Sequence, residues 1–134
     1  MENWLRWEAL KIPEGKYELI KLEQNFDGVY IILDDEINRI AISFEPGVLA
    51  IRTSDEGDRW RTISEVVSRN SGDYFVGKPI YVVRNSEFRH WYDKESFSTK
   101  GNYTHYAIIT GNDVVDILAM VEPKVEVEKM EINV

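Results

Sequence analysis

Three short runs rich in apolar residues lie between residues 29 and 54, and in the last two of them apolar and polar residues alternate. A charged bend at 34–38 separates the first two runs, and Glu45-Pro46-Gly47-Val48 separates the last two. Pro followed by Gly at the centre of a four-residue turn favours a type II turn. The stretch therefore predicts two consecutive hairpins with one apolar face, which other elements have to cover. The apolar positions of the last two runs are Ile40, Ile42, Phe44, Leu49 and Ile51.

The segments before this meander are shorter and less regular. Residues 3–10 fit either a short helix capped by Asn3 or an edge strand rich in Trp. In residues 16–24 the apolar positions change sides partway, which predicts a strand with a bulge or a twist. Asp27-Gly28 is a turn signal that joins this strand to the meander.

Two segments predict short helices that cover the sheet. Thr62 and Glu65 have the spacing of a capping box, and a narrow apolar stripe follows before Ser71-Gly72. Asn85-Ser86 is a good cap for the second helix. In that second helix, SEFRHWYDKES, the aromatic residues share one face and the polar residues point outward.

The C-terminal part predicts four more strands. Residues 79–84 are rich in Val and Ile, and 103–110 and 114–120 flank a Gly-Asn-Asp turn. The segment 113–121 also fits a helical period, but its Val and Ile content after a tight turn favours a strand. Residues 124–128 alternate cleanly and predict an edge strand.

These elements indicate one α+β domain over residues 1–134. No repeat, linker or low-complexity tract divides the chain. We expect a mainly antiparallel sheet of about six to eight strands, covered on one face by two or three short helices.

Composition narrows the functional classes. The 134-residue chain has no cysteine, which excludes disulfides, thiolate zinc sites and cysteine nucleophiles. The N-terminal segment carries charges and no continuous apolar stretch, so we expect neither a signal peptide nor a membrane span, and we predict a cytoplasmic protein.

Charge is segregated along the sequence. The net charge is −8, and residues 29–58 hold seven acids against two bases, whereas residues 59–105 hold eight bases against five acids. An acidic region repels nucleic acid and attracts a basic protein, although such a balance also serves solubility. The arginines of the basic region leave a local nucleic-acid-binding face open as a lesser alternative.

Motifs for catalysis or cofactor binding are lacking in the sequence. His90 and His105 share no ligand spacing, and the bend Asp34-Asp35-Glu36 lacks the pattern of a cation-binding loop. No glycine-rich phosphate loop or serine nucleophile elbow occurs. We therefore expect no metal and no cofactor, and we favour a non-enzymatic protein.

Protein binding is the function that charge and composition favour. Two acidic clusters flank the meander, and a Trp beside acids on a connecting segment is typical of interfaces. The expected partner is a basic protein, with neither nucleic acid nor a membrane involved. The candidate partner-binding residues are Asp34, Asp35, Glu36, Asp55, Glu56, Asp58 and Trp60.

The chain resembles the small acidic immunity proteins of bacterial polymorphic and contact-dependent toxin systems. The resemblance rests on size, lack of cysteine, the α+β pattern, and segments such as TSDEGDRW, NSEFRHWYDKES and HYAIITGNDVVDIL. It implies a protein that neutralises a toxin domain by binding it. The alternative is a small enzyme or ligand-binding domain, for which we expect a pocket between sheet and helices, with a His near a carboxylate in the enzyme case.

Overall fold

The structure, a computed structural model, describes residues 1–131. These residues form nine strands, two α-helices and one 3₁₀ helix. In chain order the elements are β1 (Asn3–Arg6), β2 (Glu18–Gln24), β3 (Val29–Asp34), β4 (Asn38–Phe44), β5 (Val48–Asp55), η1 (Glu56–Arg59), α1 (Trp60–Arg69), β6 (Ile80–Arg84), α2 (Glu87–Glu95), β7 (Thr104–Ile109), β8 (Asp113–Ala119) and β9 (Lys124–Lys129).

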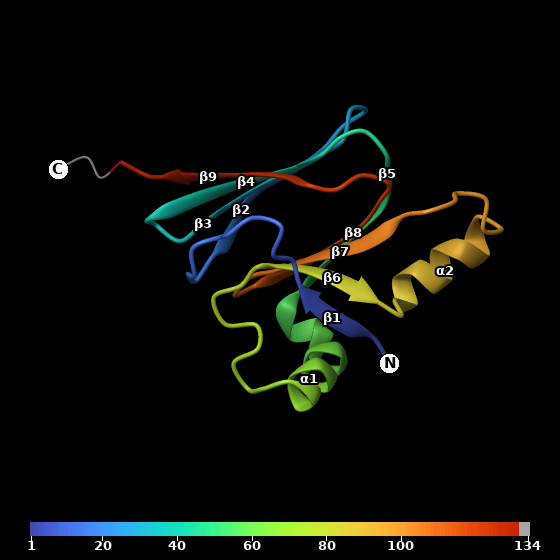
Figure 1. Cartoon of the computed structure of the whole chain (residues 1–134), viewed down its shortest axis with the longest axis horizontal. Coiled ribbons are helices and arrows are strands. Elements are labelled where there is room, and N and C mark those ends of the chain that lie inside the picture. Colours follow the sequence, from blue (N-terminus) through green and yellow to red (C-terminus); the bar gives the residue numbers. More distant parts are fainter. Residues whose placement is uncertain (132–134) are drawn as a thin grey trace.

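The strands form two antiparallel sheets that stack face to face (Figure 1). One has five strands in the order β1-β6-β7-β8-β5, and the other has four in the order β2-β3-β4-β9. Alternate residues of each sheet point into the space between them and form the main core. That core includes Val29, Ile31, Leu33, Ile40, Ile42 and Phe44 from the four-stranded sheet, and Ile80, Tyr106, Ile108, Val115, Ile117 and Ala119 from the five-stranded sheet.

Both helices pack on the opposite face of the five-stranded sheet, which we call the helix face (Figure 1). Val66 of α1 packs with Trp4, Tyr81 and other residues of this face. Phe88 of α2 packs with a second cluster that includes Leu118. The α+β class and the antiparallel pairing expected from the sequence are confirmed. The expected single sheet is wrong, because a second sheet and not the helices covers the apolar face of β3 and β4.

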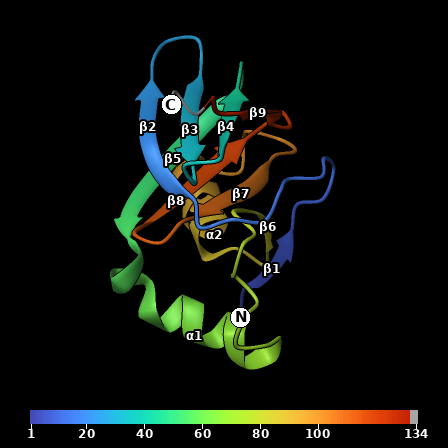
Figure 2. The same ribbon diagram turned by 90° about the vertical axis from the view of Figure 1, so that its left-hand side faces the viewer.

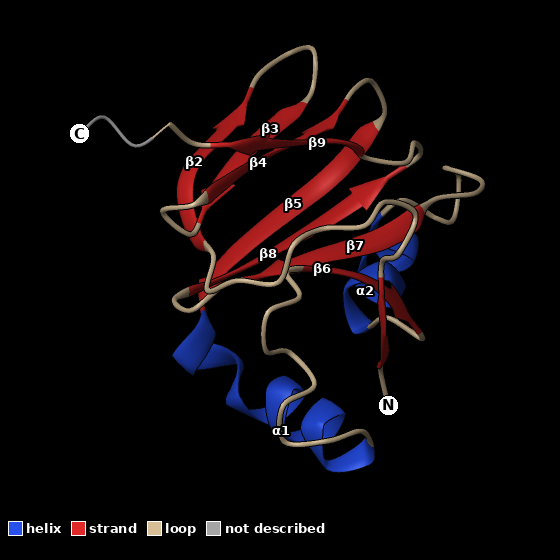
Figure 3. Cartoon of the chain, turned by 60° about the vertical axis from the view of Figure 1, so that its left-hand side comes forward, coloured by secondary structure: helices blue, strands red, loops and turns tan. Residues whose placement is uncertain are grey.

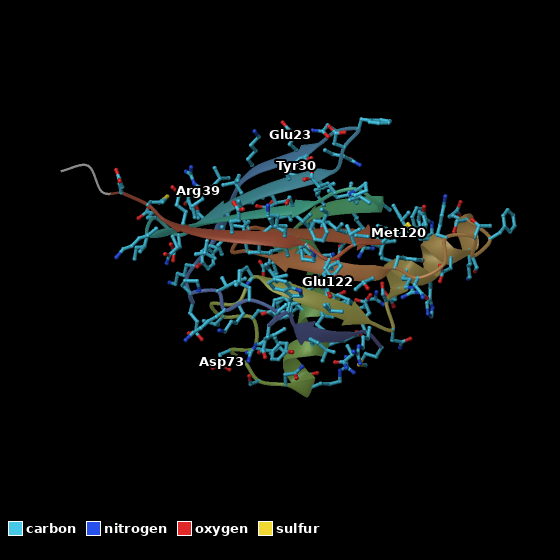
Figure 4. The ribbon with its side chains drawn as sticks, turned by 45° about the horizontal axis from the view of Figure 1, so that its top comes forward. Glu23, Tyr30, Arg39, Asp73, Met120 and Glu122 are labelled. Carbon is cyan, nitrogen blue, oxygen red and sulfur yellow. The ribbon has the colours of Figure 1, made fainter. Side chains whose placement is uncertain are left out.

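The outer face of the four-stranded sheet is polar. Glu23 lies opposite Tyr30 in the β2–β3 register, and both point away from the core together with Arg39 (Figure 4). The Tyr30 hydroxyl donates a hydrogen bond to the Glu45 carboxylate. A solvated face of this kind is normal for an antiparallel sheet that has its core on one side only.

The meander predicted from the sequence is only half correct. The β3–β4 hairpin forms, with Ile31 opposite Ile42. However, β5 does not return along β4; it pairs with β8 in the other sheet. Gly47 has the positive φ expected for it, 91°, and the Glu45–Pro46 peptide is cis. The Pro-Gly segment thus carries the chain from one sheet to the other.

Several other local predictions are resolved by strand pairing. The N-terminal segment is an edge strand, β1, which pairs with β6. The β2 register shifts between Leu19 and Lys21, which confirms the expected bulge. The segment that also fitted a helix is strand β8, and β9 is the expected edge strand.

The two helix starts differ from each other. Ser86 caps α2 as predicted, since its Oγ accepts a hydrogen bond from Arg89 N at 2.9 Å. The capping box predicted at Thr62 and Glu65 is wrong, because η1 runs directly into α1 at Trp60 and Thr62 lies inside the helix. The 3₁₀ turn that precedes α1 is capped by Asp55, whose Oδ1 accepts from Gly57 N at 2.8 Å.

The stacking of the two sheets predicts where the chain is most sensitive to truncation. Ile31→Ala removes a fully buried side chain from the centre of this core, and we expect it to lower the free energy of unfolding by about 3 kcal/mol. Ile20→Ala on β2, where the side chain is 51% exposed, is the control. Urea denaturation measures both variants. An equal decrease in the free energy of unfolding for the two variants would contradict the placement of the core between the two sheets.

Candidate functional site

The helix face carries a buried polar centre between its two apolar clusters. In the β7–β8 register Ala107 faces Asp116 and His105 faces Leu118, so His105 and Asp116 are diagonal neighbours on the same face. His105 Nε2 lies 2.7 Å from Asp116 Oδ1. His105 is 1% exposed and Asp116 is 0% exposed. A charged group in such a place has to be balanced by partners within the protein.

Two arginines supply that balance at the second carboxylate oxygen. Arg52 Nε donates to Asp116 Oδ2 at 2.9 Å, from the residue directly opposite on β5. Arg59 Nη1 donates to the same oxygen at 2.6 Å, from the end of η1. Burial raises the pKa of Asp116, but the hydrogen bond from His105 and the charges of His105, Arg59 and Arg52 outweigh this and lower the pKa from 3.8 to about 2. Asp116 is therefore ionised at neutral pH.

The network continues to α2 through Ser86. Ser86 Oγ lies 2.6 Å from His105 Nδ1 and also accepts the capping bond from Arg89 N. Arg52 adds a second link to this helix, since its guanidinium carbon lies 4.4 Å from the centre of the Phe88 ring. The polar centre thus joins β5, η1, β7, β8 and the start of α2.

The chain of contacts Ser86–His105–Asp116 has the same residue types and order as the triad of a serine hydrolase. These three residues therefore test the alternative that the protein is an enzyme. Ser86 is 2% exposed and its Oγ is held by the α2 cap. None of the three side chains lines either of the two grooves found in the described residues. A nucleophile has to reach a substrate. The geometry therefore supports a structural tie between sheet and helices.

His105 was a weak candidate from the sequence, and Asp116 was missed. The signal for Asp116 was present, since a lone acid interrupts the apolar run VVDILA. A hairpin centred on Gly111-Asn112 has a register that makes Asp116 a diagonal neighbour of His105. The other histidine, His90, is exposed on α2, as expected.

The first acidic cluster lies on the β3–β4 turn. Asp35 Oδ1 accepts hydrogen bonds from Ile37 N at 3.0 Å and Asn38 N at 2.6 Å, so this carboxylate shapes the turn. Asp34 Oδ2 forms an ion pair with Arg39 Nη2 at 3.7 Å. Glu36 is exposed and has a φ of 74° at the tip.

The second cluster leads directly into α1. Asp55 caps η1, and Asp58 is exposed on that turn. Trp60, the first residue of α1, is 77% exposed. Trp60 is therefore a surface residue and not part of the core.

The two clusters approach the same segment of chain, residues 15–18. The Asp35 carboxylate packs against Gly15, and its charge, after burial, contributes to the raised pKa of Tyr17. Glu56 of the second cluster lines a groove together with these same residues. The β3–β4 turn and the exit of β5 also lie on the same side of the molecule (Figure 3).

That groove, which we call the α1 groove, has a volume of about 530 Å³. Its lining comes from η1, α1, the segment 72–79, the β7–β8 turn and residues 15–18. In Figure 2 α1 lies at the bottom of the view, beyond the end of β5. Ile63, Val67, Phe75, Val76 and Ile109 give it an apolar lining, and Lys16, Glu18, Glu56 and Lys78 give it charged edges. A smaller hollow of about 240 Å³ lies beside Trp7 and Lys11.

Metal and membrane sites were also sought among the described residues. Within residues 1–131 no group of three His, Asp or Glu side chains is placed to hold a metal ion. No helix in this range is long and apolar enough to cross a membrane.

The buried position of Asp116 predicts a pH-dependent contribution to stability. A carboxyl with a depressed pKa stabilises the fold above its unfolded pKa and loses that contribution as the pH falls through the folded value of about 2. We expect Asp116→Asn to lower the free energy of unfolding by about 3 kcal/mol at pH 7. The difference in free energy of unfolding between this variant and the unmodified protein should decrease by about 2 kcal/mol as the pH falls from 5 to 2.

Urea denaturation at a series of pH values measures this difference. Asp113→Asn, at the half-buried start of the same strand, is the matched control and should show no comparable narrowing. A difference that stays constant from pH 5 to pH 2 would contradict the assigned charge balance.

Comparison with protein-family models, with curated proteins and with solved structures found no match. The function therefore has to follow from the residues themselves. Two surface features stand out beside the buried Asp116 centre. One is the exposed Trp60 with its acidic neighbours, and the other is the α1 groove next to them.

Proposed function

We propose that this is a non-enzymatic protein-binding protein that holds a basic partner through the acidic surface around Trp60. The observation that carries the proposal is the 77% exposure of Trp60, which follows Glu56 by four residues and Asp58 by two. An exposed indole beside acidic residues offers a partner both apolar contact area and a hydrogen-bond donor. Trp is also among the residues that most often dominate binding energy at interfaces.

The charges around Trp60 favour a basic partner. Complementary charge increases the rate at which partners meet and selects against wrong partners. Asp35 and Asp55 are engaged in local hydrogen bonds, so we assign them to shaping their loops. Asp34 is paired with Arg39, so we assign direct partner contact to the remaining candidates, Glu36, Glu56, Asp58 and Trp60.

A bacterial toxin domain is the partner class that the resemblance to immunity proteins implies. A nuclease toxin in particular needs a basic surface to bind phosphates, and an acidic inhibitor blocks that surface. We place this binding in the cytoplasm, which the cysteine-free sequence favours. The alternative of a ligand-binding domain draws support from the α1 groove, which lies beside the same acidic residues.

Trp60→Ala tests the anchor. We expect it to weaken binding to a purified candidate toxin domain encoded by a neighbouring gene by about 30-fold, because a Trp anchor typically carries a large share of the binding free energy at an interface. Trp91→Ala on α2, where the side chain is 53% exposed, is the matched control and should leave the affinity unchanged. Calorimetric titration measures both. Equal effects of the two substitutions would contradict the assignment of Trp60.

Charge reversal tests the acidic surface. The double variant Glu56→Lys with Asp58→Lys should slow association about tenfold at low salt and reduce its dependence on salt concentration. The control is Glu126→Lys with Glu128→Lys, two exposed acids on β9. Stopped-flow association at two salt concentrations measures the rates. If both pairs slow association equally, only the net charge matters and the proposed surface is wrong.

A further inference from the structure

We infer that the α1 groove receives a bulky apolar side chain from a basic segment of the partner protein. The inference rests on the proposed function and specifies the partner's binding segment. Its first support is the continuity of the groove with Trp60. Trp60, Ile63 and Val67 are spaced i, i+3 and i+7, so they share one stripe of α1. Since Ile63 and Val67 line the groove, this stripe leads from the groove to the exposed indole.

The apolar lining supports an apolar anchor. Val76 faces Ile63 and Val67 from the other wall, and it is 67% exposed although it lines the hollow. The volume of about 530 Å³ falls within the range of protein pockets that bury ligands or side chains, about 300–1,000 Å³. Covering these side chains removes apolar surface from water, which favours an apolar occupant.

The net negative charge of the segments around the groove favours a basic partner segment on either side of the apolar side chain. The segments 14–18, 55–67, 72–79 and 109–113 frame the groove and together hold eight acids and four bases. Three of the four bases are already paired within the protein. Arg59 pairs with Asp116 at 2.6 Å, Arg61 with Glu87 at 2.8 Å and Lys78 with Glu14 at 3.3 Å.

The groove therefore has an apolar lining within a surround of net negative charge. Glu18 and Glu56 lie at its edge together with Lys16 and Lys78, and Lys78 is paired with Glu14. A segment with Lys or Arg on each side of Leu or Phe matches both features, since its apolar side chain fills the hollow while its charges meet these acids.

Gly72 offers a way to fill the groove without disturbing the fold. It lines the groove, and a Cβ added to it meets no heavy atom within 4 Å. Gly72→Trp thus places a large side chain at the groove wall. The matched control is Ser68→Trp, at an exposed position of α1 that is not part of the lining. Both variants should keep the urea midpoint of the parent protein.

The test uses three fluorescently labelled hexapeptides, whose binding to the full-length chain is measured by fluorescence polarisation. The first is Lys-Arg-Leu-Phe-Arg-Lys, the second has Gly-Ser in place of Leu-Phe, and the third has Glu in place of every base. We expect the first to bind at least about tenfold more tightly than either of the others. Gly72→Trp should abolish that preference, and Ser68→Trp should leave it intact.

Two results would overturn the inference. If the first and second peptides bind equally well and Gly72→Trp changes neither, the acidic surface binds basic segments without the groove, and the proposed function survives. If no peptide binds the parent protein below a concentration of about 1 mM, the groove holds no such segment. Failure of the proposed function itself is a separate result, namely unchanged toxin binding in Trp60→Ala.

Discussion

The carboxylate of Asp116 has no exposed surface, so its charge has to be neutralised within the protein. Its partners come from three places, namely His105 on the neighbouring strand, Arg52 on the edge strand β5 and Arg59 at the end of η1. Leaving such a charge without partners is far more costly than losing an exposed ion pair. The carboxylate thus adds a charged tie between β8, β5 and η1 to the backbone pairing of β5 with β8.

This constraint reaches the surface through Arg59. Arg59 is bonded to Asp116 and is followed directly by Trp60, so the start of α1 is held at the edge of the sheet. The exposed Trp60 and the groove residues Ile63 and Val67 all lie on that helix. A preorganised interface loses less entropy when its partner binds. The buried ion pair thus prepares the surface that we propose for binding.

Local patterns predicted the fold well where pairing is local. The β3–β4 and β7–β8 hairpins, the bulge in β2 and the Ser86 cap all depend on residues close together in sequence. The partner of β5 was mispredicted because a Pro-Gly segment signals a turn but not whether the chain stays in the same sheet. The separation into two sheets depends on contacts between distant strands, which alternation alone does not specify.

The candidate site was predictable to a different degree. The acidic residues and Trp60 are visible in the sequence, because charge and aromatic content need no fold to be counted. That Asp55 caps η1, whereas Trp60 stays exposed, depends on where η1 gives way to α1. The α1 groove joins segments between residues 15 and 112, so no local pattern indicates it. The Asp116 centre was partly predictable. The sequence predicted the strand that carries Asp116, but not that arginines from β5 and η1 would pair with it.

The polar centre also divides the layer of helices. α1 covers the cluster of Trp4, Tyr81 and Val114, while α2 covers the separate cluster of Tyr103 and Leu118. Ser86, His105 and Asp116 lie between the two, and the His105 ring lies 6.5 Å from the Trp4 ring and 5.7 Å from the Phe88 ring. The two helices are therefore coupled through this polar centre and through the Arg61–Glu87 ion pair, and not through one shared apolar cluster.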